Sequence, residues 1–126
     1  MEKRKWQTEN FWKSFKCAIT GMVYSVKTGR NLIIQLCFAL FAIILGIFLK
    51  ISKIEWAIII FAILFVIFAE MLNTAVETVV DLVTEEYNEK AKIAKDISAG
   101  GVTLVAVASV IIGLIIFLPK ILKIVL

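Results

Sequence analysis

The fold is decided by one continuous stretch, residues 56–83, which reads WAIIIFAILFVIFAEMLNTAVETVVDLV. Its first part, Trp56 to Ala69, contains no charged or strongly polar side chain. A helix of roughly 18–20 apolar residues crosses the hydrocarbon core of a bilayer, which is about 30 Å thick. No proline interrupts the stretch, and its helical rhythm continues through Glu70 to about Val83. The stretch therefore predicts a membrane-spanning helix over about residues 56–83.

Two flanking stretches, residues 32–49 and 97–118, have the same apolar character. The first contains Gln35 as its only strongly polar side chain, and the second is followed by Pro119. Each is long enough to cross a bilayer, and we expect Pro119 to end the last helix. The predicted fold class is an all-α membrane protein with three transmembrane helices.

Residues 10–28 predict a fourth helix of a different kind. Their apolar side chains recur at intervals of three and four, with lysines elsewhere, which is an amphipathic pattern. The lysines, together with Trp6 and Trp12, favour a helix that lies in the membrane interface. Simple packing on the spans is the alternative. We expect residues 1–126 to form a single integral-membrane domain.

Composition places the whole chain in the membrane class. Hydrophobic residues make up 61% of the 126 residues, charged residues only 19%, and the mean hydropathy is +0.97. A soluble domain of this size would have too few polar side chains to cover its surface. The net charge of +4 is modest and the basic residues flank apolar runs, so no nucleic-acid partner is expected.

The residue types that are missing also restrict the chemistry. The chain has no histidine, which excludes histidine-based general-base catalysis and histidine-ligated zinc. A metal site would have to use oxygen ligands, which favour Mg²⁺-like cations. Cys17 and Cys37 are expected to be free thiols.

Basic residues predict the orientation in the membrane. Three spans place the N-terminal region and the loop 84–96 on one side of the membrane. That side carries more lysine and arginine than the other, so the positive-inside rule places it in the cytoplasm. The charged N-terminus has no early apolar core, so we expect no signal peptide and no cleavage. The basic residues of the predicted cytoplasmic side are Lys3, Arg4, Lys5, Lys13, Lys16, Lys27, Arg30, Lys90, Lys92 and Lys95.

A polar stripe on the central helix needs an explanation. Glu70, Asn73, Glu77 and Asp81 are spaced by three, four and four residues, so a helix brings them to one face. With Trp56 at the outer interface, Glu70 lies just inside the hydrocarbon edge, where an unpaired carboxylate costs a few kcal/mol. The structural alternative is that such polar groups only join helices by hydrogen bonds.

The stripe has the parts of a phosphoryl-transfer site. A carboxylate at the depth of a lipid hydroxyl, such as Glu70, can take its proton. Glu77, nearer the cytoplasm, can hold Mg²⁺ on a nucleotide, and Lys92 and Lys95 can offset phosphate charge. No Walker A motif or kinase glycine-rich loop is present. The residues alone leave ion, proton and phosphoryl roles open.

Two segments carry a resemblance to a known family. Residues 70–81 read EMLNTAVETVVD and residues 94–100 read AKDISAG. This pair closely resembles the prokaryotic diacylglycerol kinase family, and the resemblance covers essentially the whole chain. It implies a kinase that uses ATP and Mg²⁺ to phosphorylate a membrane lipid alcohol, undecaprenol or diacylglycerol, at the cytoplasmic membrane interface. It also implies a homotrimer with active sites shared between subunits.

The resemblance assigns a role to each matching position. Glu70 matches the catalytic base, and Glu77 matches a carboxylate that binds the metal as well as ATP. Asn73 and Asp81 match supporting positions on the active-site helix. The nucleotide-binding positions that the resemblance implies are Glu77, Glu86, Tyr87, Asn88, Lys95 and Asp96.

One position departs from the family's pattern. The family usually has a metal-binding glutamate after the first helix, where this chain has Gly29. Ile33 and Gln35 stand where basic residues or histidine are common in Gram-positive relatives. Water can replace a missing ligand on Mg²⁺. The alternative function is therefore a weakly active or inactive relative that serves as a membrane-interaction protein.

Overall fold

The computed structural model describes residues 10–126, except the side chain of Arg30, and contains four helices. The described residues form no strand, and three of the helices are long and apolar enough to cross a membrane. The predicted all-α membrane fold is thereby confirmed. The basic residues Lys3, Arg4 and Lys5 and the aromatic Trp6 lie outside the described residues. The helices are α1 (Phe11–Thr28), α2 (Arg30–Phe48), α3 (Lys53–Val83) and α4 (Glu89–Val125).

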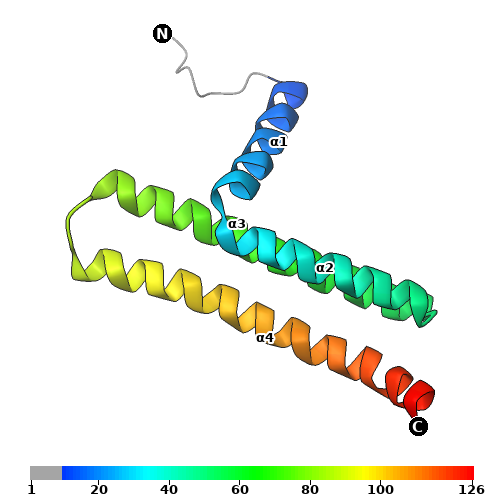
Figure 1. Cartoon of the computed structure of the whole chain (residues 1–126). Coiled ribbons are helices and arrows are strands. Elements are labelled where there is room, and N and C mark those ends of the chain that lie inside the picture. The colour runs from blue at the N-terminus through cyan, green and yellow to red at the C-terminus, as the bar shows by residue number, and fades with distance from the viewer. Residues whose placement is uncertain (1–9) are drawn as a thin grey trace.

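Helix α1 begins at a capped end and turns away from the three long helices (Figure 1). The Asn10 side chain accepts a hydrogen bond from the backbone N–H of Lys13 at 2.9 Å, which satisfies a free amide of the first turn. Every residue of α1 except Ser25 is exposed. The helix occupies the predicted range, and its place in a membrane interface stays a prediction.

The turn between α2 and α3 is tight and well defined. Lys50 has a φ of 52°, in the left-handed region, and the N–H of Ile51 donates to the carbonyl of Gly46 at 3.2 Å. This pattern is a Schellman helix end, and the buried Ile51 side chain provides its apolar contact. Ser52 then caps α3 by accepting a hydrogen bond from the N–H of Glu55 at 3.2 Å.

Helix α4 is longer than the sequence predicts at both ends. It begins at Glu89, well before Ile97, because the Asn88 side chain caps it by accepting from the N–H of Ala91 at 3.1 Å. It also continues through Pro119, so the prediction that Pro119 ends the helix is wrong. A proline removes only one backbone hydrogen bond, and transmembrane helices tolerate that loss when the flanking turns are strong.

The buried core lies at the end of the bundle where α2 turns into α3. Its buried cluster consists of Ile51, Ile59, Ile116 and Phe117. At this end the indole of Trp56 lies so close to Gly46 that a Cβ added there would be 2.8 Å from Cη2. The Nζ of Lys120 also bonds Glu55 Oε1 at 3.2 Å, which ties α4 to the start of α3.

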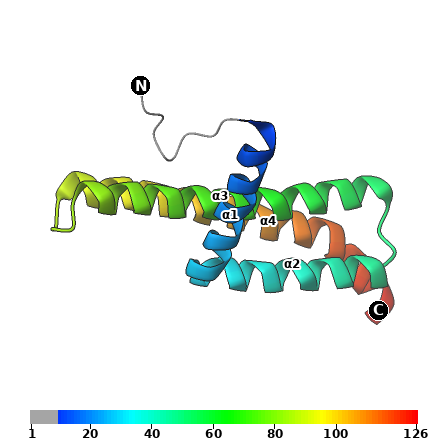
Figure 2. The same ribbon diagram turned by 90° about the horizontal axis from the view of Figure 1, so that it is seen from above.

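The remaining helix surfaces are largely uncovered. Helix α3 packs along α4 more extensively than along α2, and α2 touches α4 only slightly (Figure 2). Most apolar side chains of the three long helices are exposed. Such a large apolar surface is suited to contact with lipid or with further helices.

Candidate active site

The polar stripe of α3 runs from a buried to an exposed position. Glu70 is 4% exposed and Asn73 is 7% exposed, whereas Glu77 and Asp81 are open to solvent. Because the helix rises about 1.5 Å per residue, Glu70 and Glu77 are separated by roughly 10 Å along its axis. The predicted stripe therefore has one end inside the bundle and the other at its surface.

The carboxylate of Glu70 accepts a hydrogen bond from a side chain of α2. The Nε2 of Gln35 donates a hydrogen bond to Glu70 Oε2 at 3.3 Å. The backbone carbonyl of Glu70 accepts a second bond from the Thr74 hydroxyl at 3.1 Å, within α3. Burial of a carboxylate is tolerated when a donor reaches it, and Gln35 is the side chain that provides this donor.

One turn further along α3, Asn73 contacts Glu77. The Nδ2 of Asn73 donates to Glu77 Oε1 at 3.1 Å, while its Oδ1 atom is buried without a hydrogen-bond partner. A buried amide oxygen without a partner can accept a ligand. Carboxylate and amide oxygens are the donors that Mg²⁺ prefers, and Mg²⁺ keeps several waters besides one or two carboxylates. The described residues contain no group of three or more acidic or cysteine side chains able to hold a metal ion.

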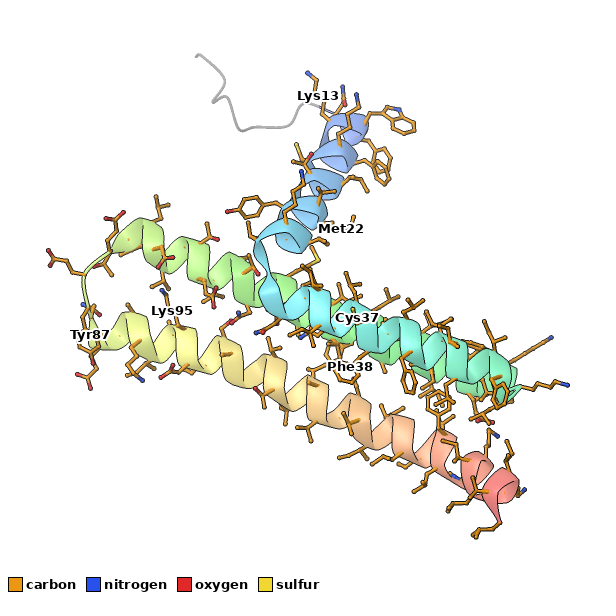
Figure 3. All side chains as sticks on the ribbon, in the orientation of Figure 1. Lys13, Met22, Cys37, Phe38, Tyr87 and Lys95 are labelled. Atoms are coloured by element: carbon orange, nitrogen blue, oxygen red, sulfur yellow. The ribbon has the colours of Figure 1, made fainter. Side chains whose placement is uncertain are left out.

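The exposed end of the stripe is joined to α4. Lys95 points from α4 toward α3 (Figure 3), and its Nζ lies 2.7 Å from Asp81 Oδ1. The negative charge of Glu77 also acts on this ammonium group. Asp96 is placed differently, because it pairs with Lys92 on α4 itself. The structure thus brings Lys95 to the stripe and leaves Asp96 outside it.

The predicted nucleotide loop connects α3 to α4. The Thr84 hydroxyl donates to the carbonyl of Glu86 at 3.1 Å and accepts from its N–H at 3.2 Å. Tyr87 is 82% exposed and lies at the hairpin end of the molecule (Figure 3). The side-chain oxygen of Asn88 is used to cap α4. All three residues are exposed, but the side chain of Asn88 is engaged in the cap, whereas no cap involves the side chains of Glu86 and Tyr87.

An apolar groove of about 510 Å³ runs between α2, α3 and α4. Its lining is almost entirely hydrocarbon, with Gln35 and Ser109 as its polar side chains. Gln35 therefore contacts the groove as well as Glu70. The sequence predicted neither the groove nor the position of Gln35 between the groove and Glu70. The signal was available, since Gln35 is the one strongly polar side chain of its span.

The profile of the family described as prokaryotic diacylglycerol kinase matches residues 16–117 of the chain. The chain belongs to this family. It is 43% identical over 114 residues to undecaprenol kinase of Bacillus subtilis, covering 90% of this chain and 93% of that protein. It is 39% identical over 125 residues to diacylglycerol kinase of Synechocystis, covering 98% of this chain and 71% of that protein. It is also 32% identical over 72 residues to diacylglycerol kinase of Escherichia coli, covering 57% of this chain and 59% of that protein.

Family membership identifies the chain as an integral-membrane lipid kinase. Gly29, where the family usually has a glutamate, forms the elbow of the chain between α1 and α2. Gly29 separates α1 from α2, with φ −88° and ψ 103°. Its N–H donates to the carbonyl of Ser25 at 2.8 Å. A Cβ added at Gly29 would lie 2.7 Å from that same oxygen and 3.2 Å from the Cβ of the buried Leu32. In this kinase the backbone at the elbow therefore leaves no room for a side chain at position 29.

Proposed function

We propose that the kinase transfers the γ-phosphoryl group of ATP to the hydroxyl of a membrane lipid alcohol, undecaprenol or diacylglycerol. The observation that carries the proposal is the gradient of burial along α3. It offers a buried carboxylate, Glu70, to a lipid and an exposed one, Glu77, to a nucleotide. Phosphoryl transfer depends mainly on positioning and electrostatics, which this arrangement supplies.

In the proposed reaction, Glu70 accepts the proton of the lipid hydroxyl. The hydroxyl oxygen forms a bond to the γ-phosphorus, and the bond from that phosphorus to the β–γ bridging oxygen breaks. ADP leaves with the bonding electron pair, and the proton on Glu70 passes later to solvent. The hydrogen bond from Gln35 keeps one carboxylate oxygen occupied, so the other is available for the lipid.

Mg²⁺ would be bound by Glu77 and by the free Oδ1 atom of Asn73. A bound Mg²⁺ would neutralise charge on the phosphates and orient them. The bond between Asn73 Nδ2 and Glu77 Oε1 fixes both side chains, so their oxygens are arranged before the nucleotide arrives. Waters and phosphate oxygens would complete the coordination.

The nucleotide would lie at the exposed end of the stripe. Lys95, positioned by Asp81, would contact a phosphate oxygen, and Glu86 and Tyr87 would contact the nucleoside. Asn88 caps α4 and Asp96 pairs with Lys92, so each would exchange that contact for one with the nucleotide.

The apolar groove would receive the hydrocarbon chain of the lipid. Its polar end is at Gln35, beside the proposed base, so a chain lying in the groove would bring its hydroxyl to Glu70. In the proposed orientation the loop 84–96 faces the cytoplasm, the membrane is the cytoplasmic membrane, and the enzyme is a homotrimer. The exposed apolar surface of the long helices is compatible with subunit contacts.

The test is transfer of labelled phosphate from Mg²⁺-ATP to undecaprenol and to diacylglycerol in bilayers. We expect transfer to at least one lipid, and we expect Glu70→Gln to abolish it while the protein keeps its fold and its elution volume. Wild-type turnover in Glu70→Gln would contradict the role of Glu70. A folded wild type that labels neither lipid would favour the inactive membrane-interaction protein.

A further inference from the structure

We infer that Gln35 is the positioning residue of the proposed base. The inference rests on the proposed function, because it concerns how Glu70 is presented to the lipid hydroxyl. Gln35 contacts Glu70 from a different helix and lines the groove on its other side. It therefore lies where the groove meets the polar stripe.

The burial of Glu70 makes its contact with Gln35 significant. Glu70 is 4% exposed, so water has little access to its carboxylate. The bond from Gln35 Nε2, at 3.3 Å, is the hydrogen bond that the structure gives this carboxylate. A buried side chain that depends on one donor has its rotamer fixed by that donor. Gln35 thus fixes one oxygen of Glu70, Oε2, and leaves Oε1 outside this bond.

The oxygen atom of the Gln35 amide distinguishes a positioning role from a packing role. Gln35 Oε1 is buried and has no hydrogen-bond partner. Burying an unpaired oxygen costs free energy, so a residue placed only for packing would be apolar at this position. An amide can donate to an ionised carboxylate and, after rotation by half a turn, accept from a protonated one. Gln35 therefore suits a partner that gains a proton in each turnover.

The test separates positioning from packing by steady-state kinetics in bilayers. In Gln35→Met, which keeps the side-chain length but lacks the donor, we expect kcat to fall roughly tenfold to a hundredfold. The KM for Mg²⁺-ATP stays within about twofold, because Gln35 bonds neither Glu77 nor Lys95. Gln35→His offers an N–H at a similar reach and keeps kcat within roughly threefold of wild type. The control is Leu36→Met, beside Gln35 but outside the groove lining, with unchanged kinetics.

Each result decides the inference. Wild-type kcat in Gln35→Met would overturn it, and so would a loss in Gln35→His as large as that in Gln35→Met. A parallel change of KM and thermal stability would mean that Gln35 only packs the helices. If Gln35→Met fails to assemble, Gln35→Asn makes the same test, because its amide is too short to reach Glu70. If the wild type labels no lipid, the proposed function fails and the inference that rests on it is overturned with it, whereas a loss confined to the Gln35 variants concerns Gln35 alone.

Discussion

Replacing Gly29 by alanine tests whether the elbow between α1 and α2 has room for any side chain. The added Cβ would lie 2.7 Å from the Ser25 carbonyl oxygen, where ordinary contact begins at 3.4 Å. The obstacle is a backbone atom, which cannot rotate away as the end of a flexible side chain can. The elbow must therefore open.

The cost can be worked from the contacts that would change. The Ser25 oxygen accepts the Gly29 N–H at 2.8 Å, so displacing it weakens a hydrogen bond with a net contribution of about 0.5–1.5 kcal/mol. The Cβ of Leu32, 3.2 Å from the new atom, is almost fully buried and has little space to move. Overpacking of this kind costs roughly 1–3 kcal/mol. We expect Gly29→Ala to destabilise the protein by about that amount.

Thermal unfolding of the detergent-solubilised protein measures the effect, and Gly21→Ala is the matched control. Gly21 lies within α1, the helix that Gly29 caps, and nothing lies within 4 Å of its added Cβ. Alanine there should stabilise the helix by roughly 0.5–1 kcal/mol. A glycine-to-alanine substitution is thus expected to raise stability at Gly21, within α1, and to lower it at Gly29, the C-terminal cap of α1.

Gly29→Glu then separates the cost of the elbow from the gain of a metal ligand. We expect it to lose as much stability as Gly29→Ala but to turn over Mg²⁺-ATP faster than that variant if the missing carboxylate limits catalysis. Equal stability of Gly29→Ala and wild type would refute the steric reasoning. Equal rates for the alanine and glutamate variants would show that a carboxylate at position 29 does not limit catalysis.

Three further predictions concern the ends of the bundle. Asp81→Asn should raise the KM for Mg²⁺-ATP up to about fivefold with little change in stability, because its pair with Lys95 is exposed and screened by solvent. An unchanged KM would count against the role of Lys95. Lys50→Gly should raise the melting temperature, since relieving a left-handed φ of 52° stabilises by up to about 1 kcal/mol; a lower melting temperature would contradict this. Lys120→Glu should destabilise by repelling Glu55, and Glu55→Lys in the same chain should restore stability if the ion pair is the cause.

The fold and the face of α3 could be predicted from sequence because both depend on local patterns. Apolar length determines where a chain can cross a bilayer, and a fixed helical period determines that Glu70, Asn73 and Glu77 share a face. These arguments need no knowledge of neighbouring helices. The all-α fold with three candidate spans is confirmed, whereas the roles of the site residues stay predictions.

The contacts between helices could not be predicted in the same way. The pairs Gln35–Glu70 and Asp81–Lys95 each join residues of different helices, and their formation depends on the rotation and height of those helices. Period and composition leave both quantities open. The course of α4 through Pro119 was missed for a related reason. A local rule forbids proline within a helix, but apolar surroundings favour keeping the backbone hydrogen-bonded on both sides of it.

The two ends of the bundle have different physical tasks. Three contacts fix the helices at the α2–α3 turn, and none of them involves a proposed substrate. They are the Schellman end of α2, the packing of the Trp56 ring against Gly46 and the ion pair between Lys120 and Glu55. At the other end the contacts are polar and few, and an oxygen atom of Gln35 and one of Asn73 are left unpaired. Unpaired buried oxygens reduce stability, so their place beside the proposed base and metal ligand is better explained by binding than by folding. Packing at the α2–α3 turn offsets that cost, and the face of α3 that contains Glu70 and Glu77 is then left to the proposed substrates.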